Sequence, residues 1–181
     1  MKTKETRSRI IDAATRVVNR VGFHRATVDA IAEEAEVSKG GVLHYFRSKD
    51  QCFEAILERV FSRILSDAEK LCQSMPEGPG RMLKAYVTAW IKWQEPPRNV
   101  QILGLLENDV LRERLIDFRV KHYALVLDDA ISPVVVQKVL LICAGLWTTP
   151  LLARANKKEL SAFFELMKAE MLQMIDDAAK Q

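Results

Sequence analysis

Two short amphipathic segments joined by a tight turn, within residues 27–49, constrain the fold of this chain more than any other feature. Thr27 is a predicted N-cap, because its hydroxyl can accept a hydrogen bond from an unpaired amide at the start of a helix. Apolar residues follow it at helical spacing, namely Val28, Ile31, Ala32 and Ala35. A turn then leads to Ser38, a second predicted N-cap, and to a helix over about residues 39–45.

The second of these helices is short and has two different faces. Val42 and Phe46 are predicted to pack inward. The outer face is basic and polar and consists of Lys39, Gly40, Gly41, His44 and Tyr45. A short helix that is held by its back face and presents such a front fits the major groove of B-DNA. The pattern therefore predicts a helix-turn-helix that binds DNA.

The segment 37–49, which reads VSKGGVLHYFRSK, resembles the signature of the TetR family of bacterial transcriptional regulators. Residues 10–14, in a predicted first helix, and Gly22 with Phe23 agree with that family as well. The resemblance covers about residues 7–60, whereas the rest of the chain agrees in length and helical character. It implies a homodimeric repressor that is released from a palindromic operator by a small, mostly apolar effector. It identifies neither the effector nor the operator, and an activator is not distinguished from a repressor.

The charge of the chain is unevenly distributed. The net charge is +3, and residues 1–50 carry 10 Lys and Arg against 7 Asp and Glu, while residues 51–181 carry 17 of each. The excess therefore lies in the segment with the helix-turn-helix pattern, where it favours contact with phosphates. The composition, 49% hydrophobic and 28% charged, is typical of a globular protein rather than a disordered one.

The cysteines and the apolar runs bear on the compartment. Cys52, Cys72 and Cys143 are odd in number and lack metal-ligand spacing, which is typical of reduced thiols. The polar N-terminus has no signal-peptide pattern. The most apolar run, residues 134–147, is interrupted by polar residues and is too short to span a bilayer. We expect a cytoplasmic protein without a membrane segment.

Helical periodicity extends along the whole chain and predicts an all-α fold of about nine helices. The predicted helices that follow the helix-turn-helix include one capped by Ser48 and one that begins at Pro133. The other spans, including the first helix, are 4–21, 81–94, 99–107, 110–131 and 157–179, and Pro150 is expected to kink or end a helix. We predict two domains, a DNA-binding head over residues 1–50 and a ligand-binding and dimerisation body over residues 51–181.

Several residues of the head are candidates for DNA contact. Lys39 is the candidate for a base edge, since an ammonium can reach O6 and N7 of guanine. Gly40 and Gly41 allow close approach of the backbone, although two glycines also suit a flexible loop. His44 is a candidate for a base or phosphate contact, or is a plain surface residue.

Phosphate contacts are expected from other positions of the same segment. Thr27 can donate its hydroxyl to a phosphate while capping, or can act as a cap alone. Ser38 belongs to the candidate set as the cap of the outward helix. The family resemblance implies phosphate contacts for Tyr45 and Lys49. It also shows a departure, because many members have Tyr where this chain has Leu43, so Leu43 is left out and is expected to pack.

Aromatic residues in the body recur at helical spacing and are candidates for a ligand pocket. The candidates are Tyr86, Trp90, Trp93, Phe118, His122, Cys143 and Trp147. Aromatic walls with a few polar groups suit a mostly apolar small molecule, although the same spacing is found in an ordinary core. We find no metal-ligand cluster, cofactor motif, nucleophile–base pair or paired carboxylates. An enzyme, a cofactor and a metal site are therefore not expected.

The last two predicted helices are strongly apolar. The helix after Pro133 is apolar on nearly all sides, and the final helix carries a long band made of Leu160, Phe163, Phe164, Met167, Met171, Met174 and Ile175. Such surface on two neighbouring helices favours a homodimer through both. Two alternatives remain, namely a DNA-binding factor of the same fold without a small-molecule ligand, and a helical protein–protein adaptor.

Overall fold

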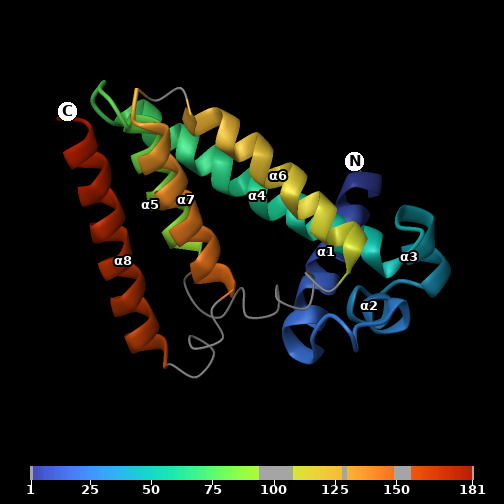
Figure 1. Cartoon of the computed structure of the whole chain (residues 1–181). Helices are drawn as coiled ribbons and strands as arrows, with labels where there is room; N and C mark the ends of the chain where they lie inside the picture. The colour runs from blue at the N-terminus through green and yellow to red at the C-terminus, as the bar shows by residue number, and fades with distance from the viewer. Residues whose placement is uncertain (1, 94–107, 128–129, 149–155, 181) are drawn as a thin grey trace. The chain divides into compact units, whose positions relative to one another are not determined.

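The computed structural model describes residues 2–93, 108–127, 130–148 and 156–180, and its regular elements there are all α-helices (Figure 1). The eight helices are α1 (Lys2–Val21), α2 (Val28–Glu34), α3 (Lys39–Tyr45), α4 (Lys49–Ser74), α5 (Arg81–Trp93), α6 (Asp109–Leu127), α7 (Pro133–Thr148) and α8 (Lys157–Ala178). The predicted all-α fold is confirmed. The predicted helix over 99–107 and the kink at Pro150 lie outside the described residues. None of the helices described is long and apolar enough to cross a bilayer.

One predicted boundary is wrong. The helix expected over 110–131 ends at Leu127, and residues 130–132 are not helical. Ala130 has a left-handed φ of 53°, and the Ser132 carbonyl accepts hydrogen bonds from the amides of Val135 and Val136 at the start of α7. The ring of a proline disfavours helical φ and ψ angles for the residue before it, so Ser132, which precedes Pro133, separates the two helices.

The chain divides into two compact units. The first contains the described parts of residues 1–60 and 101–116, and the second contains those of 61–100 and 117–181. The first turns of α4 therefore belong with α1, α2 and α3, together with the start of α6. The division into domains at residue 50 stays a prediction.

The first unit has a core of aliphatic side chains from four helices. Ile10 and Val17 of α1, Ile31 of α2, Val42 of α3 and Leu57 of α4 are all buried. At about 25 cal/mol per Å² of apolar surface, burial of each such side chain contributes about 1.5–3 kcal/mol. This core holds the two short helices, α2 and α3, which at seven residues each are too short to be stable alone.

The turn between α2 and α3 closes as a Schellman motif. The amide of Val37 donates to the Ala32 carbonyl at 3.0 Å, and the amide of Glu36 donates to the Glu33 carbonyl at 3.1 Å. Glu36 has a φ of 53°, a left-handed conformation that is usually taken by glycine. These bonds fix the direction in which α3 leaves α2, as the sequence predicted for a tight turn.

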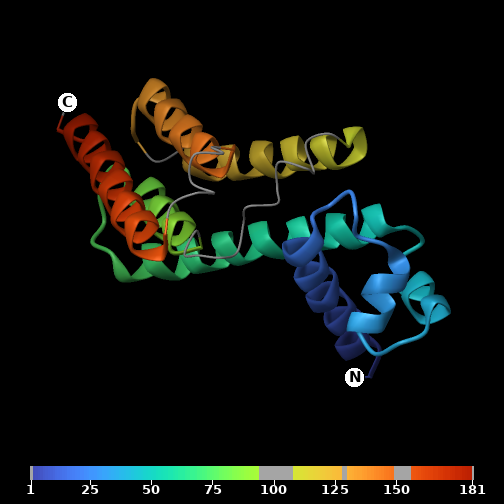
Figure 2. The same ribbon diagram turned by 90° about the horizontal axis from the view of Figure 1, so that it is seen from below.

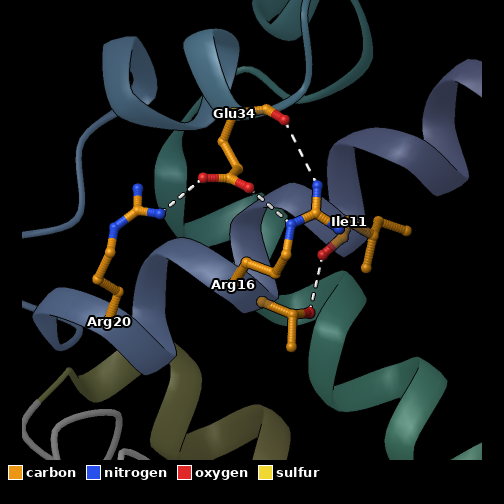
Figure 3. A network of polar contacts seen from close by, with 5 residues as sticks. Ile11, Arg16, Arg20 and Glu34 are labelled. Atoms are coloured by element: carbon orange, nitrogen blue, oxygen red, sulfur yellow. Dashed lines mark hydrogen bonds and ion pairs between the residues drawn. The ribbon is translucent and has the colours of Figure 1, made fainter.

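Two arginines of α1 hold the end of α2 (Figure 3). Arg16 Nε and Arg20 Nη1 each lie 2.7 Å from a carboxylate oxygen of Glu34. Arg16 Nη2 also donates to the Glu34 carbonyl at 3.4 Å, one of the carbonyls that a helix end leaves unpaired. The hydrogen bonds from Arg16 and Arg20 lower the pKa of Glu34 below its ordinary value. This cluster, Arg16, Arg20 and Glu34, is called the α1–α2 clamp below.

In the second unit, α5, α7 and α8 pack side by side (Figures 1 and 2). Gly80, the residue before α5, has a φ of +75° and lies close to side chains of α8 and of the segment before α7. A Cβ on Gly80 would lie 2.4 Å from Ile175 Cγ2 and 3.2 Å from Ile131. Only glycine combines this backbone conformation with such a close contact.

Candidate nucleic-acid interface and candidate ligand site

The side chains of α3 divide into a buried face and an exposed face. Val42 is fully buried, and Phe46 is buried at the C-cap. The exposed residues are Lys39, Gly40, Leu43 and His44, and Gly41 and Tyr45 are half-buried at the edge of that face. Val42 and Phe46 are thus buried as predicted, whereas only three of the five predicted outer residues are exposed. Leu43, which we expected to pack, is 38% exposed on the same outer face.

Both predicted N-caps are formed. Thr27 Oγ1 accepts a hydrogen bond from the Ala30 amide at 3.1 Å, and Ser38 Oγ accepts one from the Gly41 amide at 2.9 Å. Ser48 Oγ caps α4 in the same way, accepting from the Gln51 amide. A capping hydroxyl accepts with its oxygen, so its own O–H remains able to donate. The hydroxyl groups of Thr27 and Ser38, at the exposed starts of α2 and α3, can therefore each donate one further hydrogen bond.

The two glycines of α3 differ in their surroundings. A Cβ on Gly40 would meet only Ser38 Oγ, at 3.9 Å. A Cβ on Gly41 would lie 3.3 Å from that oxygen and 3.4 Å from Val37 Cβ. Packing within the protein therefore restricts residue 41 but leaves space for a larger side chain at residue 40.

Lys39 forms an ion pair that sequence reasoning missed. Its Nζ lies 2.9 Å from Asp29 Oδ2 in the first turn of α2, and both side chains are well exposed, at 58% and 66%. The sequence holds no direct signal for this pair, because the two residues belong to different helices and their contact depends on the turn at Glu36.

The remaining candidates of the head, Tyr45 and Lys49, have contacts inside their own unit. Lys49 Nζ donates to the Ala26 carbonyl at 3.5 Å and lies 5.0 Å from the centre of the Phe23 ring. Tyr45 makes an edge contact with the ring of His44, with centroids 5.1 Å apart. Lys49 thus links the start of α4 to the segment before α2.

Three of the candidates for ligand binding come together in the second unit. The Tyr86 hydroxyl and His122 Nδ1 are hydrogen-bonded at 3.3 Å. Phe61 of α4, which is not among the predicted candidates, stacks on Phe118 with ring centroids 5.5 Å apart and meets the edge of the His122 ring at 4.9 Å. Tyr86 of α5 and His122 of α6 thus form a polar pair. Phe61 of α4 and Phe118 of α6 supply the aromatic rings beside it.

Burial controls the chemistry of this cluster. Desolvation lowers the pKa of His122 to about 4, so its imidazole is neutral near pH 7. Burial, and secondarily the Cys143 thiol, raise the pKa of Tyr86. Burial also raises the pKa of Cys143 to about 12, and its Sγ contacts Met171 Sδ at 3.8 Å. These neutral groups suit recognition of an uncharged molecule better than acid–base catalysis.

The three tryptophan candidates lie on α5 and α7. Trp90 is buried and Trp93 half-buried on α5, and the side chain of Trp147 lies outside the described residues. The described residues contain no group of three or more His, Cys, Asp or Glu side chains placed to hold a metal ion.

Comparison with known proteins adds independent information. Residues 10–56 match the model of the bacterial regulatory proteins of the tetR family. The chain is 37% identical over 82 residues to the HTH-type transcriptional regulator BetI of Escherichia coli O127:H6 (strain E2348/69 / EPEC), which covers 45% of this chain and 42% of BetI. The matched region thus spans about two fifths of the length of that curated relative.

The fold has relatives along its whole length. A TetR transcription regulator from Haloarcula marismortui ATCC 43049 has a TM-score of 0.77 at 18% identity, over 97% of this chain and 98% of that one. The multidrug binding protein EbrR, in complex with malachite green, has a TM-score of 0.66 at 22% identity, over 93% and 97%. The matched family consists of regulatory proteins rather than enzymes, in agreement with the expectation from the sequence. The N-terminal residues of the chain are thus similar to the tetR family of bacterial regulatory proteins, and its helical fold is similar to that of TetR-type regulators along nearly the whole chain.

Proposed function

We propose that this protein is a homodimeric transcriptional repressor that binds a palindromic operator and is released from it by a small, mostly apolar effector. The observation that carries the proposal is the outer face of α3, where Lys39, Gly40 and His44 are exposed while Val42 anchors the helix from behind. A recognition helix needs this arrangement, because base edges are read by side chains at the floor of the major groove.

Phosphate contacts complete the proposed interface. Thr27 and Ser38 each have a hydroxyl at the start of a short helix, where amides and the helix dipole favour an anion. Tyr45 lies half-buried at the edge of the exposed face. Lys49 reaches a phosphate only if its ammonium leaves the Ala26 carbonyl, a weak bond at 3.5 Å. Phosphate contacts position the head, and the contacts of α3 supply the sequence preference.

Dimerisation through α7 and α8 is supported by the apolar side chains that these helices leave exposed. Val134 and Leu141, seven residues apart on α7, are 61% and 59% exposed, and Leu166 on α8 is 58% exposed. Phe164, Met171 and Ile175 of the apolar band on α8 are buried within their own unit. The proposed dimer surface therefore uses a face of α8 other than the one that these three residues occupy. Two heads are needed because one short helix makes few base contacts.

The effector is proposed to contact the aromatic cluster of the second unit. Tyr86, Phe118 and His122 offer rings and a neutral polar pair, which suits an apolar molecule with one polar group. EbrR, which is similar in fold, is a multidrug binding protein with a structure in complex with malachite green. An effector of this kind shifts the protein from its operator only by its differential affinity for the two states. As a regulator of bacterial genes, the protein is expected to act in the cytoplasm.

The proposed function is tested by selecting bound fragments from random duplex DNA with the purified protein at about 0.15 M salt. We expect an enriched palindrome with half-sites about one helical turn apart, or a multiple of it. The matched control is the double variant Lys39→Ala and Tyr45→Ala, which should fold but enrich no sequence. Enrichment of the same palindrome by this variant would refute the assigned interface. Absence of enrichment by a folded, dimeric wild type would favour a protein–protein adaptor.

A further inference from the structure

The ion pair between Lys39 and Asp29 places a negative charge at the face proposed to meet DNA. Lys39 is the first residue of α3, and its Nζ lies 2.9 Å from Asp29 Oδ2. The two side chains are 58% and 66% exposed, and an exposed ion pair contributes little to folding stability. Asp29 also lies in the first turn of α2, where a carboxylate stabilises the helix modestly through the helix dipole, but this effect does not require Lys39 beside it.

The negative charge of Asp29 is unfavourable for attraction to the phosphates of DNA. A carboxylate beside the ammonium cancels its charge, and attraction to phosphates is the main source of non-specific affinity. With Asp29 in place, Lys39 gains little from a phosphate. The pair therefore lowers binding to DNA in general.

The same pair orients Lys39 for a base edge. An ammonium has three N–H donors, and the bond to Asp29 uses one of them. The two that remain match the two acceptors, O6 and N7, that guanine presents in the major groove. A carboxylate accepts through several lone pairs, so Asp29 can also accept from N4 of a neighbouring cytosine. Adenine presents a single acceptor, N7, beside its N6 amino donor, and thymine presents the single acceptor O4, so neither base can accept both remaining N–H groups of Lys39.

We propose that Asp29 is a specificity-determining residue, which holds Lys39 for the edge of a guanine and disfavours its contact with phosphate. This inference rests on the proposed function, because it assumes that α3 enters the major groove. It assigns the sequence preference to a pair of helices rather than to α3 alone.

The test compares Asp29→Asn with wild type on the selected operator and on a random duplex of equal length, over a range of salt concentrations. The variant should bind the random duplex more tightly, with a salt dependence steeper by about 0.9 for one added phosphate contact. Its ratio of operator to random affinity should fall about fivefold or more. Repeated selection with the variant should relax the preference at one guanine position of each half-site and leave the others unchanged.

Glu33→Gln is the matched control, because Glu33 is exposed one helical turn from Asp29 on α2 and its replacement changes the charge equally. It should leave the affinity ratio and the selected sequence unchanged. In a Lys39→Met background, Asp29→Asn should not lower the ratio further. An unchanged ratio in Asp29→Asn, or an equal fall in Glu33→Gln, would overturn the inference while leaving the proposed function intact. Absence of any selected sequence for wild type would instead refute the proposed function.

Discussion

Gly40→Ala should make the free protein more stable. A Cβ at residue 40 meets only Ser38 Oγ at 3.9 Å, which is an ordinary contact, so the methyl group fits without displacing a neighbour. Alanine favours a helix over glycine by about 0.5–1 kcal/mol. For a chain of 181 residues, this raises the unfolding temperature by about 1–4 °C. Calorimetry of the DNA-free protein measures the change.

The same substitution should weaken operator binding. The added methyl group projects from the exposed face of α3 and holds the backbone off the DNA by about 1.5 Å, the length of a carbon–carbon bond. Good base contacts discriminate by about 1–3 kcal/mol each, so loss of one lowers operator affinity roughly 5- to 150-fold. Fluorescence anisotropy with the selected operator measures the loss.

Gly41→Ala is the matched comparison. Its Cβ would lie 3.4 Å from Val37 Cβ and 3.3 Å from the capping oxygen of Ser38, so the helix preference of alanine is offset by crowding. We expect no gain in unfolding temperature for this variant. A lower unfolding temperature for Gly40→Ala would refute the assignment of open space at residue 40. Operator affinity within twofold of wild type would refute close approach of the backbone to DNA.

Three further outcomes are expected. Gly80→Ala should lower the free energy of unfolding, measured in urea, by about 2–4 kcal/mol, because it adds both left-handed backbone strain and a clash. Gly78→Ala, at a φ of +154° with nothing within 4 Å, should lower it less. Equal losses in the two variants would contradict the clash at residue 80. Because burial lowers the pKa of His122 to about 4 from 6.5, the unfolded chain takes up a proton below pH 6.5 that the folded chain does not. Wild type should therefore lose up to about 3 kcal/mol more than His122→Phe between pH 7 and pH 4, and parallel stability curves would refute this. Leu141→Glu should remain helical by circular dichroism but sediment as a monomer that binds operator weakly, and an intact dimer would exclude this face of α7.

The local elements of the head could be predicted because their signals are local. The caps at Thr27, Ser38 and Ser48 depend on residues three positions apart, and each forms the expected hydrogen bond. The buried positions of α3 likewise follow from helical spacing. The end of α6 was missed, because its apolar spacing continues to Ile131 while Pro133 constrains the backbone before it.

Contacts between elements could not be predicted in the same way. The pair of Lys39 with Asp29 and the packing of Phe61 on Phe118 depend on how helices cross, which no spacing along one helix encodes. The sequence also gave no reason to separate Gly40 from Gly41, since their difference comes from the position of Val37 across the turn. The residue types of the candidate sites were therefore predictable, and their pairings were not.

The α1–α2 clamp has a consequence for what a regulatory signal can change. The Glu34 carboxylate pairs with Arg16 and Arg20, the turn at Glu36 joins α3 to α2, and the three helices share one core, so we expect them to move as one body. In the proposed dimer, the base sequence of each half-site and the spacing between the half-sites are then recognised separately. An effector can change the spacing that the dimer fits, but it leaves the preferred half-site sequence unchanged. Operators with the same half-sites and different spacings should therefore differ in their relative affinity for the ligand-free and the ligand-bound protein.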